Sequence, residues 1–195
     1  MTNPALRIAV ADDEQDMRDY FQKILPPLGY DVVSAAKTGR ELVDDCNRLN
    51  PDLVITDIKM PELDGIEAAT LIYQQRAIPV ILVSAFSDKE LIDRAEADHI
   101  MAYLVKPVKQ ADLEPAIALA IRRFQQFEAL RLEAVGLRQA LADRKIIERA
   151  KGILMKRASL DEQDAFRRMQ KLASEKNKKL VEVAHMIVTF EEAVQ

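Results

Sequence analysis

The chain has 195 residues, of which 49 % are apolar, and it contains eight prolines and five glycines. These values are typical of one or two folded domains and exclude a low-complexity protein. No apolar run reaches the ~18–20 residues that a membrane-spanning helix needs, and the first residues lack the basic and apolar regions of an export signal, so we expect a cytoplasmic protein without a membrane partner. The single cysteine, Cys46, cannot form an internal disulfide and is interpreted as a small residue on a helix.

The net charge of −4 is unevenly distributed along the chain. Residues 1–136 contain 15 Lys and Arg against 23 Asp and Glu, a net charge of −8. Residues 137–195 contain 13 against 9, a net charge of +4. This asymmetry favours two modules with different partners, and the basic module favours nucleic acid.

The first part of the chain alternates between short apolar runs and amphipathic stretches. Apolar residues with helical spacing run from Gln15 to Leu25 and from Thr38 to Leu49, and a shorter helix is expected from Leu91 to Ala97. Strands alternating with helices predict βαβ units, so we expect an α/β fold with a five-stranded, doubly wound parallel sheet over about residues 5–120. Five apolar runs, rich in residues that favour strands, are the predicted strands: LRIAV (6–10), DVVSA (31–35), DLVIT (52–56), PVILVSA (79–85) and AYLV (102–105).

After Pro107 the pattern becomes helical. Apolar residues recur at steps of four and three from Leu113 to Phe127, and the rhythm resumes, after a short step, from Leu130 to Leu141. This seam predicts a coiled-coil helix over residues 111–141 that pairs with a second copy of the chain; packing of the helix on its own domain is the alternative.

The remaining residues predict a small all-α domain of three helical segments. The sequence SLDE, Ser159 to Glu162, has the pattern of a capping box ahead of a helix over Asp161–Ser174. The basic sequence KNKK interrupts the pattern, and a last helix carries an apolar stripe of Leu180, Val183, Ala184, Ile187 and Val188.

Polar residues follow the predicted strands at the edge where a parallel sheet binds ligands. Three carboxylates that meet there repel one another unless a cation offsets them, and Mg²⁺ suits carboxylate, water and phosphate oxygens. Asp57 is then a candidate nucleophile toward phosphorus, Lys106 can meet phosphoryl charge, and Ser84 can donate a hydrogen bond to it. The residues at the strand ends are Asp12 and Asp13, Asp57, Ser84, and Lys106 with Pro107.

The motifs ADDE, ITDIKMPELDG, PVILVSA and AYLVKP resemble the receiver domain of bacterial two-component response regulators, a flavodoxin-like fold. The resemblance implies that Asp57 accepts a phosphoryl group from a sensor histidine kinase. It also implies slow self-dephosphorylation, so we expect a timer without a small-molecule substrate and not a metabolic enzyme. In the family, Mg²⁺ is held by the residues that match Asp13, Asp57 and the backbone carbonyl of Lys59, while Asp12 assists through water.

The same resemblance assigns roles to residues on the last two strands. Ser84 and Tyr103 match the pair that repositions on phosphorylation. Lys106 matches the phosphate-binding lysine, and the bond before Pro107 is expected to be cis. Two positions qualify the likeness: His99 and Ile100 stand where the family usually has Gly-Ala, so the corner before the fifth strand is expected to differ in shape.

One residue argues against the hypothesis that this pocket belongs to a phosphatase. Enzymes of the haloacid type have a second acid two positions after the nucleophile, and Lys59 occupies that position. Independently of any family, Pro61 and Gly65 predict a turn that positions the loop after Asp57.

The segment Arg144–Arg157 contains six cations and one anion, Glu148. On a helix its apolar residues form one stripe and its cations flank that stripe. Gly152 would let a flat ligand or another backbone come close. The alternative is the charged, solvated face of an ordinary helix.

The sequence over about residues 137–193 resembles the ANTAR domain, a three-helix RNA-binding module of transcription antiterminators; the most specific motifs are IERAKGILM, DAFRRM and LVEVA. The resemblance implies binding to paired hairpins in nascent mRNA, each with a six-base loop, which prevents a terminator from forming. Residues 137–195 hold no Trp or Tyr, so stacking on bases would fall to Arg or aliphatic side chains. The candidate RNA-binding residues are Arg144, Arg149, Lys151, Lys156 and Arg157.

The expected organisation is a receiver domain over residues 1–120, a coiled-coil helix over 111–141 and an ANTAR-like domain over 137–195. We expect a phosphorylation-controlled antiterminator that is a homodimer at least when active. A DNA-binding response regulator and a protein-binding signalling adaptor are the alternatives; the first would need a helix-turn-helix or winged domain, and neither a turn glycine nor a β-wing is evident.

Overall fold

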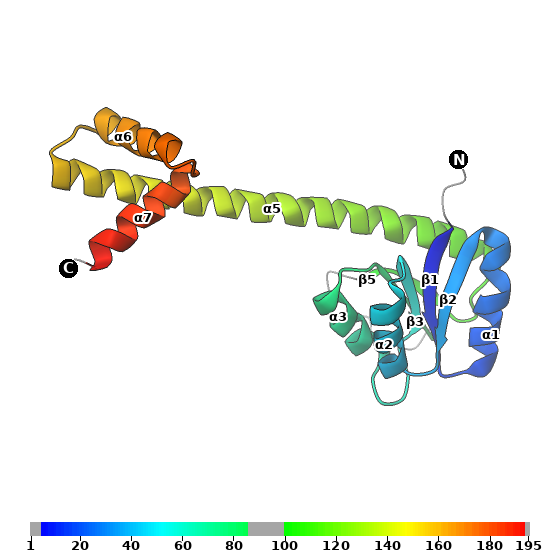
Figure 1. Cartoon of the computed structure of the whole chain (residues 1–195). Helices are drawn as coiled ribbons and strands as arrows, with labels where there is room; N and C mark the ends of the chain where they lie inside the picture. Colours follow the sequence, from blue (N-terminus) through cyan, green and yellow to red (C-terminus); the bar gives the residue numbers. More distant parts are fainter. Residues whose placement is uncertain (1–4, 86–99, 194–195) are drawn as a thin grey trace. The chain divides into compact units, whose positions relative to one another are not determined.

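The computed structural model describes residues 5–85 and 100–193 (Figure 1). The chain divides into two compact units, Met1–Glu128 and Ala129–Gln195. The predicted helix over Leu91–Ala97 and the predicted corner at His99 lie outside the described residues.

The first unit is built on a five-stranded sheet whose strands are all parallel. Its order, β2-β1-β3-β4-β5, makes β1 and β3 neighbours although β2 separates them in the chain. The prediction of an α/β, doubly wound parallel sheet is thereby confirmed. The strands are β1 (Leu6–Ala11), β2 (Tyr30–Ala36), β3 (Leu53–Asp57), β4 (Val80–Ser84) and β5 (Ile100–Val105).

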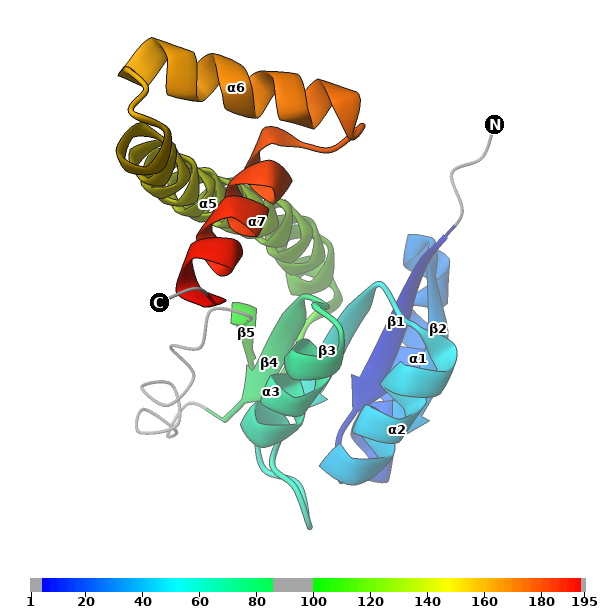
Figure 2. The same ribbon diagram turned by 60° about the vertical axis from the view of Figure 1, so that its left-hand side comes forward.

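Helices cover both faces of this sheet because neighbouring residues along a strand point to opposite sides. Ala9 on β1 packs with buried residues of α2 (Gly39–Leu49) and α3 (Gly65–Gln75). Ile8 belongs to the opposite core, which α1 (Gln15–Ile24) covers. Figure 2 shows α2 and α3 on one side of the strands and α1 on the other. A short 3₁₀ helix, η1 (Pro26–Leu28), precedes β2.

The lone cysteine is part of the core, as interpreted from the sequence. Cys46 on α2 is 2 % exposed. Burial, together with the negative charge of Asp45, raises the pKa of its thiol to about 12, although Arg76 opposes the shift. The thiol is therefore neutral at physiological pH.

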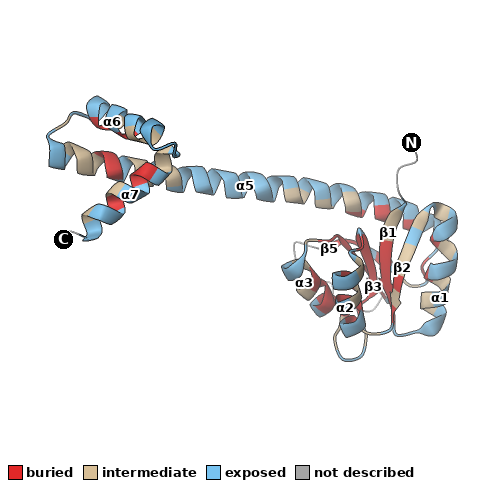
Figure 3. Ribbon diagram, viewed as in Figure 1, coloured by how far each residue is buried: buried red, intermediate tan, exposed pale blue. Residues whose placement is uncertain are grey.

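Helix α5 (Gln110–Ala158) is a single helix of 49 residues. In the first unit, Leu113, Ile117 and Ala120 are buried in the core that also contains α1. Further along, Leu130, Leu137 and Leu141 are 61–66 % exposed, and Figure 3 shows this middle stretch as accessible. The first part of the predicted seam thus packs on its own domain, and the coiled-coil pairing of the second part stays a prediction.

The second unit combines the end of α5 with α6 (Glu162–Glu175) and α7 (Leu180–Ala193). Ala150, Met169, Ala184 and Val188 are its buried centre. The prediction of three helical segments is confirmed, with the first segment being the end of α5.

The predicted capping box at Ser159 is wrong. Ser159 has φ 51° and does not cap α6. Asp161 is the N-cap, and its carboxylate accepts a 2.7 Å hydrogen bond from the backbone N–H of Asp164. An aspartate two residues downstream therefore competes successfully for the same role.

Within the described residues, no helix is long and apolar enough to cross a membrane.

Candidate functional site

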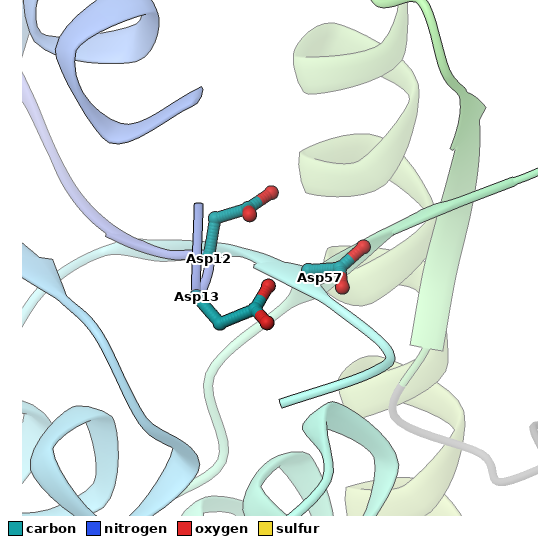
Figure 4. Close-up of side chains that lie close together, drawn as sticks. All are labelled: Asp12, Asp13 and Asp57. Carbon is teal, nitrogen blue, oxygen red and sulfur yellow. The ribbon is translucent and has the colours of Figure 1, made fainter. Parts of the chain in front are cut away.

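Three carboxylates meet at the carboxyl ends of neighbouring strands. Asp12 and Asp13 directly follow β1, and Asp57 is the last residue of β3. One oxygen from each carboxylate lies within 4.8 Å of the others (Figure 4). The strand order explains this proximity, because β1 and β3 pair side by side.

The two buried acids differ in their hydrogen bonds. Asp12 is fully buried, and its Oδ1 accepts a 2.9 Å hydrogen bond from the backbone N–H of Glu14. Its Oδ2 accepts no hydrogen bond from any described residue, although it forms an ion pair with Lys106. Asp57 Oδ2 accepts from the backbone N–H of Lys59 at 3.0 Å.

The Lys106 ammonium lies among the acids. Its Nζ is 3.0 Å from Asp12 Oδ2, 3.2 Å from Asp57 Oδ1 and 3.4 Å from Glu14 Oε1. Burial alone would lower the pKa of Lys106, but the carboxylates of Asp12 and Asp57 outweigh that effect and raise it. Lys106 is therefore positively charged wherever its neighbours are ionised.

One cation does not offset the whole cluster. Burial raises the pKa of Asp57, and the charges of Asp12 and Asp13 raise it further despite the opposing effect of Lys106. Excess negative charge and the buried Asp12 oxygen without a hydrogen bond fit a divalent cation with oxygen ligands. Lys59, whose backbone carbonyl is predicted to bind the cation beside Asp13 and Asp57, lines an open cavity of about 470 Å³ together with Asp13.

The predicted switch residues lie on β4 and β5. Ser84 is buried at the end of β4, and its hydroxyl donates to the carbonyl of Ala85 at 3.1 Å. Tyr103 on β5 is 38 % exposed. The Lys106–Pro107 peptide bond is cis, as predicted.

Gly65 supports the loop after Asp57 in a way that the sequence did not reveal. It begins α3, and its N–H donates a 2.8 Å hydrogen bond to the carbonyl of Ile58. A Cβ at this position would lie 2.0 Å from the carbonyl oxygen of Asp57. The sequence indicated a turn here, but the close approach of two backbones appears only in three dimensions.

The five candidate RNA-binding residues fall into three groups. Arg149 pairs with Glu192 at 2.8 Å, and Arg157 pairs with Glu191 at 2.9 Å. Arg144 and Lys156 are exposed and make no ion pair with a described residue. Gly152 adjoins three of these residues in a cavity of about 410 Å³, where an added Cβ would meet no atom within 4 Å. The cavity is lined by Arg149, Gly152, Ile153, Lys156, Arg157 and Glu191.

Lys151 differs from the other four candidates. Only 8 % of the residue is exposed. Its ammonium forms ion pairs of 2.7 Å with Glu148 on the same helix and with Glu162 on α6. Its contacts therefore join two helices of the second unit.

Comparison with known proteins identifies both parts of the chain. Residues 8–118 match the response regulator receiver domain, and residues 136–188 match the ANTAR domain. The chain belongs to the response regulators with a receiver domain and an ANTAR domain.

One relative of this response regulator matches along nearly its whole length. The transcriptional regulatory protein PdtaR of Mycobacterium tuberculosis is 40 % identical over 182 residues, which cover 93 % of this chain and 89 % of the relative. A protein-glutamate methylesterase/protein-glutamine glutaminase of Archaeoglobus fulgidus is 30 % identical, but this chain spans only 42 % of it. The presence of a receiver domain alone therefore does not determine the activity of the protein that contains it.

Solved structures agree with the fold of the receiver domain. The receiver domain of a modulated diguanylate cyclase from Desulfovibrio desulfuricans superposes with a TM-score of 0.59 at 28 % identity, covering 63 % of this chain and 98 % of that one. A receiver domain protein from Clostridium thermocellum gives 0.57 at 30 % identity, with 62 % and 98 % covered.

Proposed function

We propose that this response regulator is phosphorylated on Asp57 by a sensor histidine kinase and, when phosphorylated, binds RNA hairpins to promote transcription antitermination. The observation that supports the proposal best is that one chain contains both an acid cluster around Lys106 and, on its ANTAR domain, a cationic cavity.

The geometry of the acids supports phosphoryl transfer to Asp57. A carboxylate oxygen of Asp57 attacks the phosphorus of phosphohistidine, an O–P bond forms, the N–P bond breaks, and the histidine nitrogen keeps the electron pair. The Lys106 ammonium, 3.2 Å from Asp57, offsets the charge of the transferred group. Mg²⁺, held by Asp13, Asp57 and the Lys59 carbonyl with Asp12 assisting through water, would supply further positive charge. Ser84 and Tyr103 would respond to the new phosphoryl group.

The RNA surface is formed by the accessible cations. Arg144 and Lys156 are open to solvent, and Arg149 and Arg157 have side chains that are 55 % exposed. The Arg149–Glu192 pair is more than half exposed on both sides and contributes little stability, so a phosphate can displace Glu192. We assign Lys151 to the packing of α5 on α6, because its side chain is only 11 % exposed and its ammonium pairs with a carboxylate on each helix.

The accessible stretch of α5 would pair two chains. A dimer presents two ANTAR domains to two hairpins, and binding both raises the affinity without any new contact. Phosphorylation would act by shifting this pairing. The proposed binding partners are therefore a kinase, hairpin RNA and a second copy of the chain.

A binding experiment distinguishes this function from its alternatives. Fluorescence anisotropy with a two-hairpin RNA, each hairpin bearing a six-base loop, should show saturable binding that weakens with salt, whereas duplex DNA of the same length should bind at least tenfold more weakly. Preferential binding to duplex DNA would favour a DNA-binding regulator, and binding to neither would favour a protein-binding adaptor.

A further inference from the structure

An aromatic side chain is exposed at the end of the second unit. Phe190 on α7 is 70 % exposed, the highest fraction among the large apolar residues described. It lies two positions beyond the segment that matches the ANTAR family. Burying an exposed phenyl ring against another apolar surface is favourable. The position of Phe190 therefore favours binding of a ligand with a flat apolar face.

Phe190 lines an apolar groove of about 370 Å³ that α5, α6 and α7 form together. Ile153 and Leu154 form its α5 wall, and Met186 and Ile187 belong to the α7 wall with Phe190. Met186 is 41 % exposed, so the groove is open to solvent. The groove also has Arg157 and Lys176 in its lining.

The groove adjoins the cationic cavity described above. Ile153, Arg157 and Glu191 line both. One side of the shared wall is thus apolar, and the other contains Lys156 and Arg149. A nucleotide has the matching chemistry: a flat base that stacks on apolar and aromatic surfaces, joined to a phosphate that binds cations.

We propose that the groove binds an unstacked base of the RNA loop, that this base stacks on Phe190, and that its phosphate lies against Arg157 and Lys156. The proposal rests on the RNA binding proposed above and adds the position of the base. Glu191 releases Arg157 when the phosphate arrives. Sequence reasoning assigned stacking to Arg or aliphatic side chains; Phe190 supplies an aromatic ring instead.

Substitutions at Phe190 test the role of the ring, because a residue this exposed contributes little to the fold. Phe190→Ala should weaken binding to the two-hairpin RNA by about tenfold or more, the effect of losing one stacked base. Phe190→Leu should lose most of the affinity as well, since it keeps apolar area but not a flat face. Phe190→Tyr should bind like the wild type.

Two further measurements distinguish an RNA base from a second copy of the chain as the group that binds in the groove. Replacing single loop bases by 2-aminopurine should identify one position whose fluorescence falls on binding to the wild type and stays high with Phe190→Leu. Equal RNA affinity for all variants would overturn the proposal while leaving RNA binding itself intact. If Phe190→Ala halves the mass in solution and Phe190→Leu does not, the groove holds a second copy of the chain. Failure of the wild type to bind RNA would instead defeat the function proposed above.

Discussion

Gly65 allows no side chain, because a Cβ there would lie 2.0 Å from the carbonyl oxygen of Asp57. This contact fixes the backbone that follows Asp57. The nearby hydrogen bond from the Lys59 N–H to Asp57 Oδ2 depends on the same loop. The geometry around Asp57 is thus set by backbone packing as well as by the charged side chains.

Replacing this glycine should therefore impair both stability and phosphorylation. Gly65→Ala forces the loop away from α3, so we expect a loss of about 1–3 kcal/mol in unfolding free energy and at least a tenfold slower phosphorylation by acetyl phosphate. Urea unfolding and phosphoprotein gels measure the two effects. Wild-type phosphorylation of Gly65→Ala would show that the close approach is unimportant.

Gly136 provides the matched control for this substitution. It lies on α5, and an added Cβ would meet no atom within 4 Å. Gly136→Ala should raise the unfolding free energy by up to about 1 kcal/mol, because alanine favours a helix, and should leave phosphorylation unchanged.

At the scale of elements, α5 changes its role along its length. Its first turns are buried in the core of the receiver unit, and Leu130, Leu137 and Leu141 remain exposed on one stripe. A helix that leaves the three leucines of one stripe more than half exposed gains stability by pairing with another helix. The exposed stripe therefore predicts a dimer.

A charge placed on this stripe should separate the dimer. Leu137→Lys brings two ammonium groups together at the predicted seam, so we expect the mass in light scattering to fall from about twice to about once the 22.0 kDa of one chain. Leu132→Lys makes the same change at a residue that is 63 % exposed but off the seam, and should leave the mass unchanged. The opposite pattern would place the interface elsewhere.

The sequence predicted the helices and strands better than the side-chain contacts between them. The strand-end acids and the parallel sheet follow from local motifs and from the ordering of βαβ units, which residue patterns encode directly. The cis bond before Pro107 was expected only from the resemblance to receiver domains. The burial of Lys151 did not follow, because its partner Glu162 lies on another helix. The cap at Asp161 was missed since Ser159 satisfies the same local rule and only the φ of 51° excludes it.

At the scale of the molecule, α5 contributes residues to the cores of both units. We propose that phosphorylation of Asp57 changes the pairing of α5 and thereby the presentation of the RNA surface. The phosphoryl group adds negative charge beside Lys106, which already contacts Asp12, Glu14 and Asp57. A redistribution of these contacts would be the first structural change after phosphorylation.

The most direct test compares RNA affinity with and without a phosphoryl mimic. Adding fluoroberyllate and Mg²⁺ to the wild type should tighten binding to the two-hairpin RNA by at least tenfold, whereas Asp57→Asn, which removes the acceptor carboxylate, should show no response. Equal affinity of the wild type in both conditions would contradict control of RNA binding by Asp57.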